Sequence, residues 1–147
     1  MLVDNFFTPS EAAAWGGYVS SHGRLNKLIE ENLRRTAGLS HAEYEVLMRL
    51  FRSDEGRLRI QALAADSVLT HSGTSRLVDR LEGAGLVERI EATEDRRGAY
   101  ASITAHGRKH FEATARKHHT FVRKLFLQNF TEDELQTMAS FWDRLDL

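Results

Sequence analysis

The stretch LTHSGTSRLVDRLEGAGLVERIEATEDRR, residues 69–97, decides the fold. Thr70 can cap a helix, because its hydroxyl can accept a hydrogen bond from one of the free N–H groups of the first turn. Apolar residues then recur at helical spacing and form one stripe, made of Leu77, Val78, Leu81 and Ala84. Gly83 and Gly85 can end the helix, because glycine adopts the left-handed stop conformation without a Cβ clash. The stretch therefore predicts an amphipathic helix between Thr70 and these glycines.

Two strand-like runs follow this helix and enclose a charged loop. Residues 86–90 (LVERI) alternate as in a short strand, and residues 99–104 (AYASIT) form a second β-like run. The loop between them, EATEDRR, carries Arg96 and Arg97 at its tip. Helix, tight turn, strand, basic loop and strand is the layout of a winged helix. Its helix can enter the major groove of DNA while the loop reaches the neighbouring minor groove.

The same region carries a family resemblance. The runs SGTSRLVDRLEGAGLVER, EDRRGAY and ITAHG resemble the MarR family of bacterial transcriptional regulators. The resemblance extends over nearly the whole chain, from about Pro9 to Leu145. It implies a mainly α fold with a small β-wing, in which a winged helix-turn-helix is flanked by N- and C-terminal dimerisation helices.

Capping residues mark the other helices. The segment Thr8–Glu11 can open a helix that runs to about Thr36, with Gly38 as its stop. The segment Ser40–Glu43 is a second capping box and opens the first helix of the lobe. Thr104 can cap a long helix that we place from about residue 105 to residue 129.

That long helix needs a partner. About 25 residues give about 37 Å of helix, which is too long for the winged helix alone to bury. A last helix opens at Thr131, and its Phe141 and Trp142 would be exposed apolar surface in a monomer. We therefore expect a two-fold homodimer in which the first helix and the last two helices of both chains intertwine, as the family resemblance also implies.

We accordingly expect one MarR-type chain, residues 1–147, with three parts. The N-terminal dimerisation helix takes residues 9–36, the winged helix-turn-helix DNA-binding lobe residues 39–104, and the C-terminal dimerisation helices residues 105–147.

Polar residues opposite the apolar stripe are candidates for DNA contact. Arg76 is the strongest candidate for a base contact, because a guanidinium can bond guanine O6 and N7 together. Arg80 points less squarely outward and is expected to meet phosphate. The set predicted for this recognition helix is Thr70, His71, Ser72, Ser75, Arg76 and Arg80. The alternative interpretation for each of these residues, taken alone, is that it only lies on a solvent-exposed face of the helix.

The wing and the start of the second helix supply further candidates. An arginine in a minor groove is favoured by the negative potential there. The resemblance implies that Asp95 braces one wing arginine while the other is inserted, with Arg96 and Arg97 in either role. The alternative is a charged hairpin tip that only aids solubility. Ser40 and His41 can present free N–H groups to the DNA backbone.

Four residues are candidates for an effector pocket, namely Trp15, His22, Tyr44 and His118. They are chosen by polarity and by position on helical stripes, and the ordinary alternative is a hydrogen-bonded residue at the edge of a core or interface. The seven histidines raise the alternative of a zinc-sensing MarR-type regulator. A zinc site needs three or four convergent ligands, and no full set is found. No metal and no other cofactor is therefore predicted.

Composition excludes several functional classes. Cysteine is absent, which rules out disulfides and thiol-based sensing. No apolar run approaches the roughly 18 to 20 residues of a membrane span, and the N-terminus lacks the pattern of a signal peptide, so we expect a cytoplasmic protein without membrane contact. Catalytic motifs such as a phosphate-cradling glycine loop are missing, so we expect no enzyme. The net charge of -1 disfavours a non-specific DNA-bending protein.

The sequence thus predicts a homodimeric, sequence-specific regulator that binds double-stranded DNA at a pseudo-palindromic operator. Its two recognition helices would lie about one helical turn of DNA apart. The resemblance implies repression that is relieved by a small, often aromatic, ligand. The alternative from another class is a winged helix used as a protein-interaction module, and the arginine-tipped wing counts against it.

Overall fold

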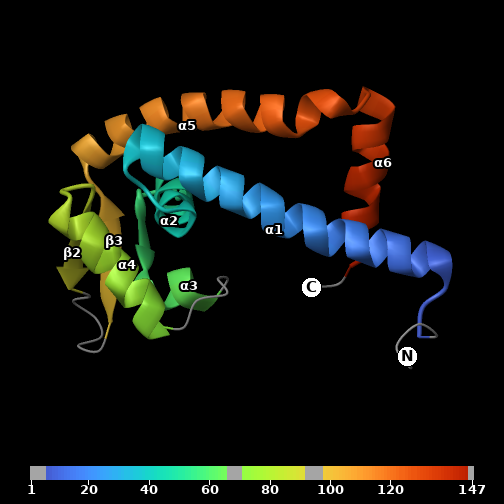
Figure 1. Cartoon of the computed structure of the whole chain (residues 1–147). Coiled ribbons are helices and arrows are strands. Elements are labelled where there is room, and N and C mark those ends of the chain that lie inside the picture. Colours follow the sequence, from blue (N-terminus) through green and yellow to red (C-terminus); the bar gives the residue numbers. More distant parts are fainter. Residues whose placement is uncertain (1–5, 66–70, 92–97, 146–147) are drawn as a thin grey trace.

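The computed structural model describes residues 6–65, 71–91 and 98–145 (Figure 1). The elements in chain order are α1 (Pro9–Ala37), α2 (His41–Arg52), β1 (Arg57–Arg59), α3 (Ile60–Ala65), α4 (His71–Gly83), β2 (Val87–Glu91), β3 (Ala99–Ile103), α5 (Ala105–Leu125), the short 3-10 helix η1 (Leu127–Asn129) and α6 (Glu132–Trp142).

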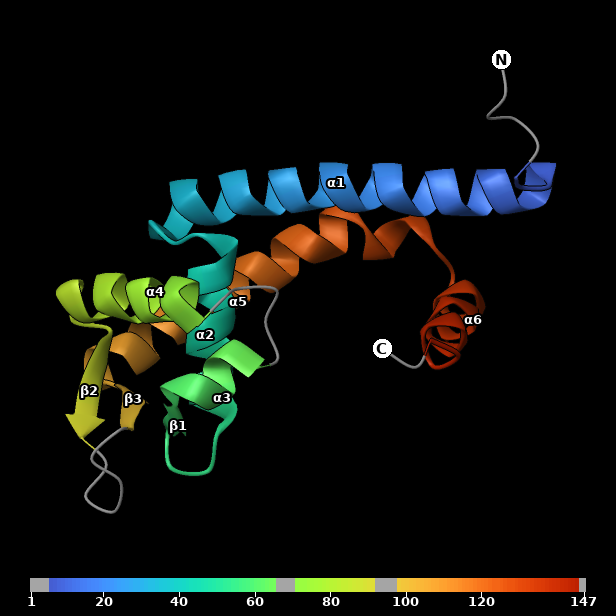
Figure 2. The ribbon, with the colours of Figure 1, turned by 90° about the horizontal axis from the view of Figure 1, so that it is seen from below.

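The molecule consists of a lobe and an arm. The lobe contains α2, α3, α4 and the strands, while α1 and α5 leave it together and diverge toward α6 at the far end (Figures 1 and 2). The three strands form an antiparallel sheet in the order β1-β3-β2. Arg59 of β1 lies opposite Tyr100 of β3, and Arg89 of β2 lies opposite Ala101. The mainly helical fold with a small β-wing that the sequence predicts is confirmed.

Local capping accounts for the starts of α1, α2, α5 and α6, as the sequence predicts, while the predicted cap Thr70 of α4 lies outside the described residues. Thr8, Ser40 and Thr131 each form a complete capping box at the start of α1, α2 and α6. The hydroxyl of Thr104 accepts a hydrogen bond from the backbone N–H of Gly107 at the start of α5. Gly38 ends α1 in the left-handed conformation, with φ 69°.

The core lies within the lobe, between the helices and the sheet. Its large apolar side chains that are at most 2% exposed are Leu33, Leu47, Leu50, Leu63, Val78, Leu81 and Val87. The predicted stripe of α4 supplies Val78 and Leu81 to this set, and Leu77 is also buried. Burial of aliphatic side chains contributes about 1.5–3 kcal/mol each, so this shared core fixes α4 against the lobe.

Two boundary predictions were wrong. Ala84 is exposed rather than buried, because α4 ends at Gly83 and Gly85 turns the chain at φ 70°. The helix expected to reach Asn129 ends at Leu125. There the side-chain amide of Asn129 donates to the carbonyl of Leu125 and replaces the next helical hydrogen bond.

The start of α5 lies directly against the turn that follows α4. The hydroxyl of Thr104 donates to the carbonyl of Gly85 over 2.7 Å, and the backbone N–H of Thr104 donates to the carbonyl of Leu86 over 3.1 Å. A Cβ at Gly107 would overlap the carbonyl oxygen of Leu86. Only glycine therefore permits this close approach of α5 to the backbone before β2.

We predict that Gly107→Ala lowers the free energy of unfolding by about 1–3 kcal/mol, because backbone must shift to admit the methyl group. Urea denaturation measures the change. Gly83→Ala is the control, because nothing lies within 4 Å of a Cβ there and alanine is the better helix former. Equal midpoints for the two variants would contradict the close approach.

Candidate nucleic-acid interface

The surface that α4 and the wing share lies on one side of the lobe. The N-terminal end of α4 and the wing ends of β2 and β3 lie on the side of the lobe away from α5 (Figure 1). On α4, the side chains of Arg76, Asp79 and Arg80 are exposed, while Thr74 is buried. The N-terminal end of α4 and the strand ends next to the wing therefore face the same side of the lobe.

The predicted recognition residues are only partly within the described residues. His71 and Ser72 belong to the first turn of α4, and their side chains lie outside the described part, as does all of Thr70. Of the remaining residues, Arg76 is exposed as the sequence predicts. The three predicted wing residues, Asp95, Arg96 and Arg97, also lie outside the described residues. Their roles stay predictions.

Ser75 is half-buried, not freely exposed, because a side chain from β2 reaches it. The guanidinium of Arg89 donates to the carbonyl oxygen of Ser75 over 3.2 Å and to its hydroxyl over 3.1 Å. The same guanidinium pairs with Asp79 and lies 3.6 Å from the carboxylate of Glu82. Sequence reasoning treated Arg89 only as a strand residue and missed this contact.

Arg80 has a partner within the protein. Its Nε donates to Oε1 of Glu43 on α2 over 2.7 Å, and the other oxygen of Glu43 accepts the N–H of Ser40 over 2.8 Å. Glu43 is buried, at 7% exposure. Burial raises the pKa of Glu43, but the hydrogen bonds from Arg80 and Ser40 together outweigh burial and keep the pKa below the ordinary value. Arg80 therefore joins α4 to α2, which the helix-face argument did not foresee.

The N–H groups at the start of α2 are not free, contrary to the premise of their predicted role. The N–H of Ser40 donates to Glu43, and the N–H of His41 donates to Glu30 of α1 over 2.6 Å. The amide of Glu43 donates to the hydroxyl of Ser40. The carboxylates satisfy these donors because a buried N–H without a partner is costly. A contact of Ser40 and His41 with the DNA backbone stays a prediction, but their N–H groups are already bonded within the protein.

The four candidate effector residues do not gather in one place. Tyr44 and His118 touch, with ring centroids 4.6 Å apart, where α5 crosses α2. Burial lowers the pKa of His118, and the neighbouring His41 and His119 lower it further. Among the described residues, Nδ1 of His118 is a buried polar atom without a hydrogen-bond partner.

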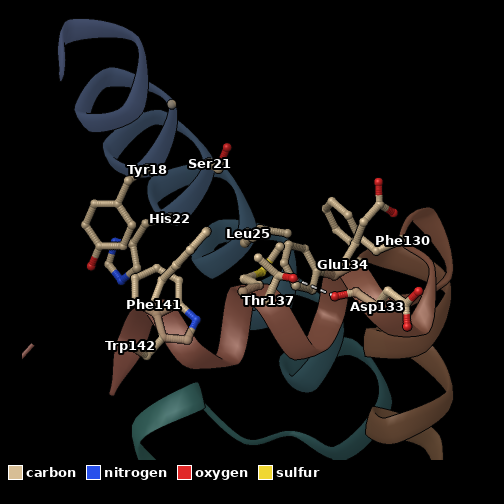
Figure 3. Close-up of a pocket in the computed structure, with 13 residues that line it drawn as sticks. Tyr18, Ser21, His22, Leu25, Phe130, Asp133, Glu134, Thr137, Phe141 and Trp142 are labelled. Atoms are coloured by element: carbon tan, nitrogen blue, oxygen red, sulfur yellow. Dashed lines mark hydrogen bonds between the residues drawn. The ribbon is translucent and has the colours of Figure 1, made fainter. Parts of the chain in front are cut away.

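His22 belongs to a separate cavity between α1 and α6. This cavity has a volume of about 790 Å³, and Tyr18, His22, Phe141 and Trp142 gather at one end of it (Figure 3). Trp15 does not line it and is 58% exposed. The cavity is open and mainly apolar, and of the four residues predicted for an effector pocket only His22 lines it.

Within the described ranges, metal-binding clusters and membrane-spanning helices are both absent. No group of three or more histidine, aspartate or glutamate side chains there is arranged to hold a metal ion. None of the described helices combines the length and the apolar character needed to cross a bilayer.

Comparison with known proteins gives consistent matches to one family. The MarR family profile matches residues 39–98. The transcriptional regulator PapX of Escherichia coli is 28% identical over 116 residues, which cover 77% of this chain and 70% of PapX. The repressor YetL of Bacillus subtilis is 27% identical over 114 residues, which cover 75% of this chain and 68% of YetL.

A solved structure matches the whole architecture. Sco3205 of Streptomyces coelicolor, a MarR family transcriptional regulator crystallised in complex with DNA, is 29% identical. It superposes with a TM-score of 0.89 and covers 95% of this chain and 87% of its own chain. The match includes the arm as well as the lobe, so the fold similarity is not limited to the winged helix.

We predict that Arg80→Ala lowers the free energy of unfolding by about 1–3 kcal/mol at neutral pH, because it leaves a buried carboxylate without its cation. The pKa of Glu43 is lower in the folded chain than the ordinary 4.5, so its contribution is present above pH 4.5 and is lost as the pH falls. The difference between wild type and variant should therefore shrink in acid. Chemical denaturation at several pH values measures it.

Arg34→Ala is the matched control for this test. Arg34 pairs with Glu30 over 2.6 Å, and the two side chains are 62% and 35% exposed. Exposed pairs contribute about 0–1 kcal/mol, so this variant should change stability little. A larger loss for Arg34→Ala than for Arg80→Ala would contradict the structural role of the Arg80–Glu43 pair.

Proposed function

The chain belongs to the MarR family of winged helix-turn-helix transcriptional regulators, and we propose that it binds a pseudo-palindromic operator as a homodimer. Like its relatives, it is a DNA-binding regulator, and it is not an enzyme. In this proposal α4 enters the major groove with Arg76 foremost. The wing reaches the adjacent minor groove through Arg96 or Arg97 while Asp95 braces the other arginine.

The observation that carries the proposal is the common side on which α4 and the wing ends lie (Figure 1). A relative of the same architecture was crystallised with DNA, which supports the use of this side for the same ligand. About half to two-thirds of the hydrogen bonds in such interfaces go to the phosphates and sugars of the DNA backbone. The residues suited to that task at the N-terminal end of α4 are Thr70, His71, Ser72 and Ser75.

Unpartnered apolar surface supports the homodimer. The chain exposes 10955 Å², whereas a compact monomer of 16.7 kDa exposes about 7600 Å². Large apolar side chains on α1 and α6 account for part of the excess, including Trp15, Tyr18, Phe141 and Trp142, each between 45% and 58% exposed. We place the arm of a second copy in the cavity between α1 and α6. Residues 9–36 and 105–147 would then be the dimerisation parts.

We place the effector at the contact between α2 and α5, beside Tyr44 and His118. The buried, unpartnered Nδ1 of His118 offers a hydrogen bond that a small phenolic or other aromatic ligand could fill. Such a ligand would relieve repression only if it binds more tightly to an arrangement of the two lobes that does not fit DNA than to the arrangement that does. A repressor role is supported by the name of one relative.

We predict that the chain prefers DNA upstream of its own gene to an unrelated fragment by at least about 1000-fold, and that the double variant Arg96→Ala, Arg97→Ala loses this preference. Fluorescence anisotropy at two salt concentrations measures both affinities. Arg24→Ala on the exposed face of α1 is the control. Weak and equal binding of both fragments by wild type would refute the proposal for this DNA and favour a protein-interaction module.

We predict that wild type sediments as a dimer and that the double variant Phe141→Ala, Trp142→Ala shifts the equilibrium toward monomer by at least about tenfold. Full burial of a large apolar side chain contributes about 1.5–3 kcal/mol, and the dimer would bury the exposed half of each ring. Analytical ultracentrifugation across a concentration series measures the shift. Phe6→Ala is the control, because Phe6 is 79% exposed and does not line the cavity. A wild-type monomer at all concentrations would contradict the dimer.

A further inference from the structure

We propose that Arg89 is a positioning residue for DNA recognition, which holds α4 against β2 and directs the hydroxyl of Ser75 toward the ligand. This inference rests on the proposed function, because it describes how the same surface is set. Arg89 lies on β2, the strand that runs into the wing, so one guanidinium connects the two parts that must meet DNA together.

The contacts of Arg89 span two turns of α4. Its terminal nitrogen donates to the carbonyl and hydroxyl oxygens of Ser75 and pairs with Asp79 one turn later. Its Nε lies 3.6 Å from Glu82, whose carboxylate also accepts the backbone N–H of Arg89 over 3.2 Å. The planar guanidinium of an arginine can bind several acceptors in fixed directions. These contacts therefore define how α4 is rotated about its own axis and where it lies along the sheet.

The contact with Ser75 sets the polarity of its hydroxyl. The Ser75 oxygen accepts from a cation, so its own proton points away from Arg89. The hydroxyl is then presented as a donor, which suits phosphate oxygens and the acceptor atoms of guanine or thymine in the major groove. Ser75 was predicted as a DNA contact, and Arg89 gives that contact a direction.

The ion pairs also offset unfavourable charge. Asp79 is exposed on the outward face of α4, where an unpaired carboxylate would repel the phosphates of DNA. The side chains of Arg89, Asp79 and Glu82 are 31%, 59% and 44% exposed, so water and salt screen these pairs in part. Loss of Arg89 would therefore both free α4 and leave two carboxylates near the ligand.

The decisive variant is Arg89→Gln, tested alone and with Asp79→Asn. In the free protein, we expect Arg89→Gln to raise amide hydrogen exchange of residues 73–79 at least threefold while exchange in the core of α5 is unchanged. With DNA, we expect the ratio of operator to non-operator affinity to fall at least tenfold. Arg89→Gln in an Asp79→Asn background should cost much less, because both substitutions break the same pair.

Three comparisons keep the test specific. Simple loss of folded protein would lower both DNA affinities equally and leave their ratio unchanged. A direct phosphate contact by Arg89 would instead lower the slope of log affinity against log salt by about one, whereas positioning leaves this slope unchanged. Arg57→Gln is the matched control, because Arg57 is an exposed arginine of the same sheet that pairs with Glu55 and not with α4.

Unchanged exchange in α4, a reduced salt slope with the affinity ratio intact, or additive effects with Asp79→Asn would each overturn the proposal. A wild type without preference for any DNA would refute the proposed function instead. The exchange data would then still decide whether Arg89 holds α4.

Discussion

The ion pair between the buried carboxylate of Glu43 and Arg80 is the interaction that joins α4 to the start of α2. One of its oxygens closes the capping box of α2 and the other accepts Arg80 of α4. A neighbouring amide of the same helix start, that of His41, is bonded to Glu30 of α1. A buried charge is tolerated only with such partners, and together these bonds connect the start of α2 to α1 on one side and to α4 on the other.

Local signals in the sequence were sufficient for the elements but not for the contacts between them. Capping boxes involve residues three apart, and the stripe of α4 involves neighbouring turns, so both could be read from the chain. The partners of Arg80 and Ser75 lie 37 and 14 residues away. A helical projection shows which face a side chain occupies, but it cannot show that Glu43 or Arg89 comes from another element to meet it.

The candidate effector residues show a second limit. His22 and Leu33 both belong to the 29 residues of α1, a helix about 43 Å long. Sequence position gives the direction of a side chain and its height along such a helix, but not which other element faces it at that height. His22 therefore faces the cavity beside α6, while Tyr44 and His118 meet at the lobe, and no pattern in one sequence distinguishes the two locations.

The unbroken length of α5 has a mechanical consequence. Its 21 residues form a rod about 31 Å long, and Phe111 near the lobe packs against Tyr44 and Phe51 with ring centroids 5.4 and 4.8 Å apart. With this aromatic cluster as the fulcrum, about 21 Å of helix lies between Phe111 and Leu125, so a tilt of about 10° displaces the far end by about 4 Å, close to a third of the roughly 12 Å width of a major groove. A small change of angle where α5 meets the lobe therefore moves the end of α5 that lies in the arm by several ångströms.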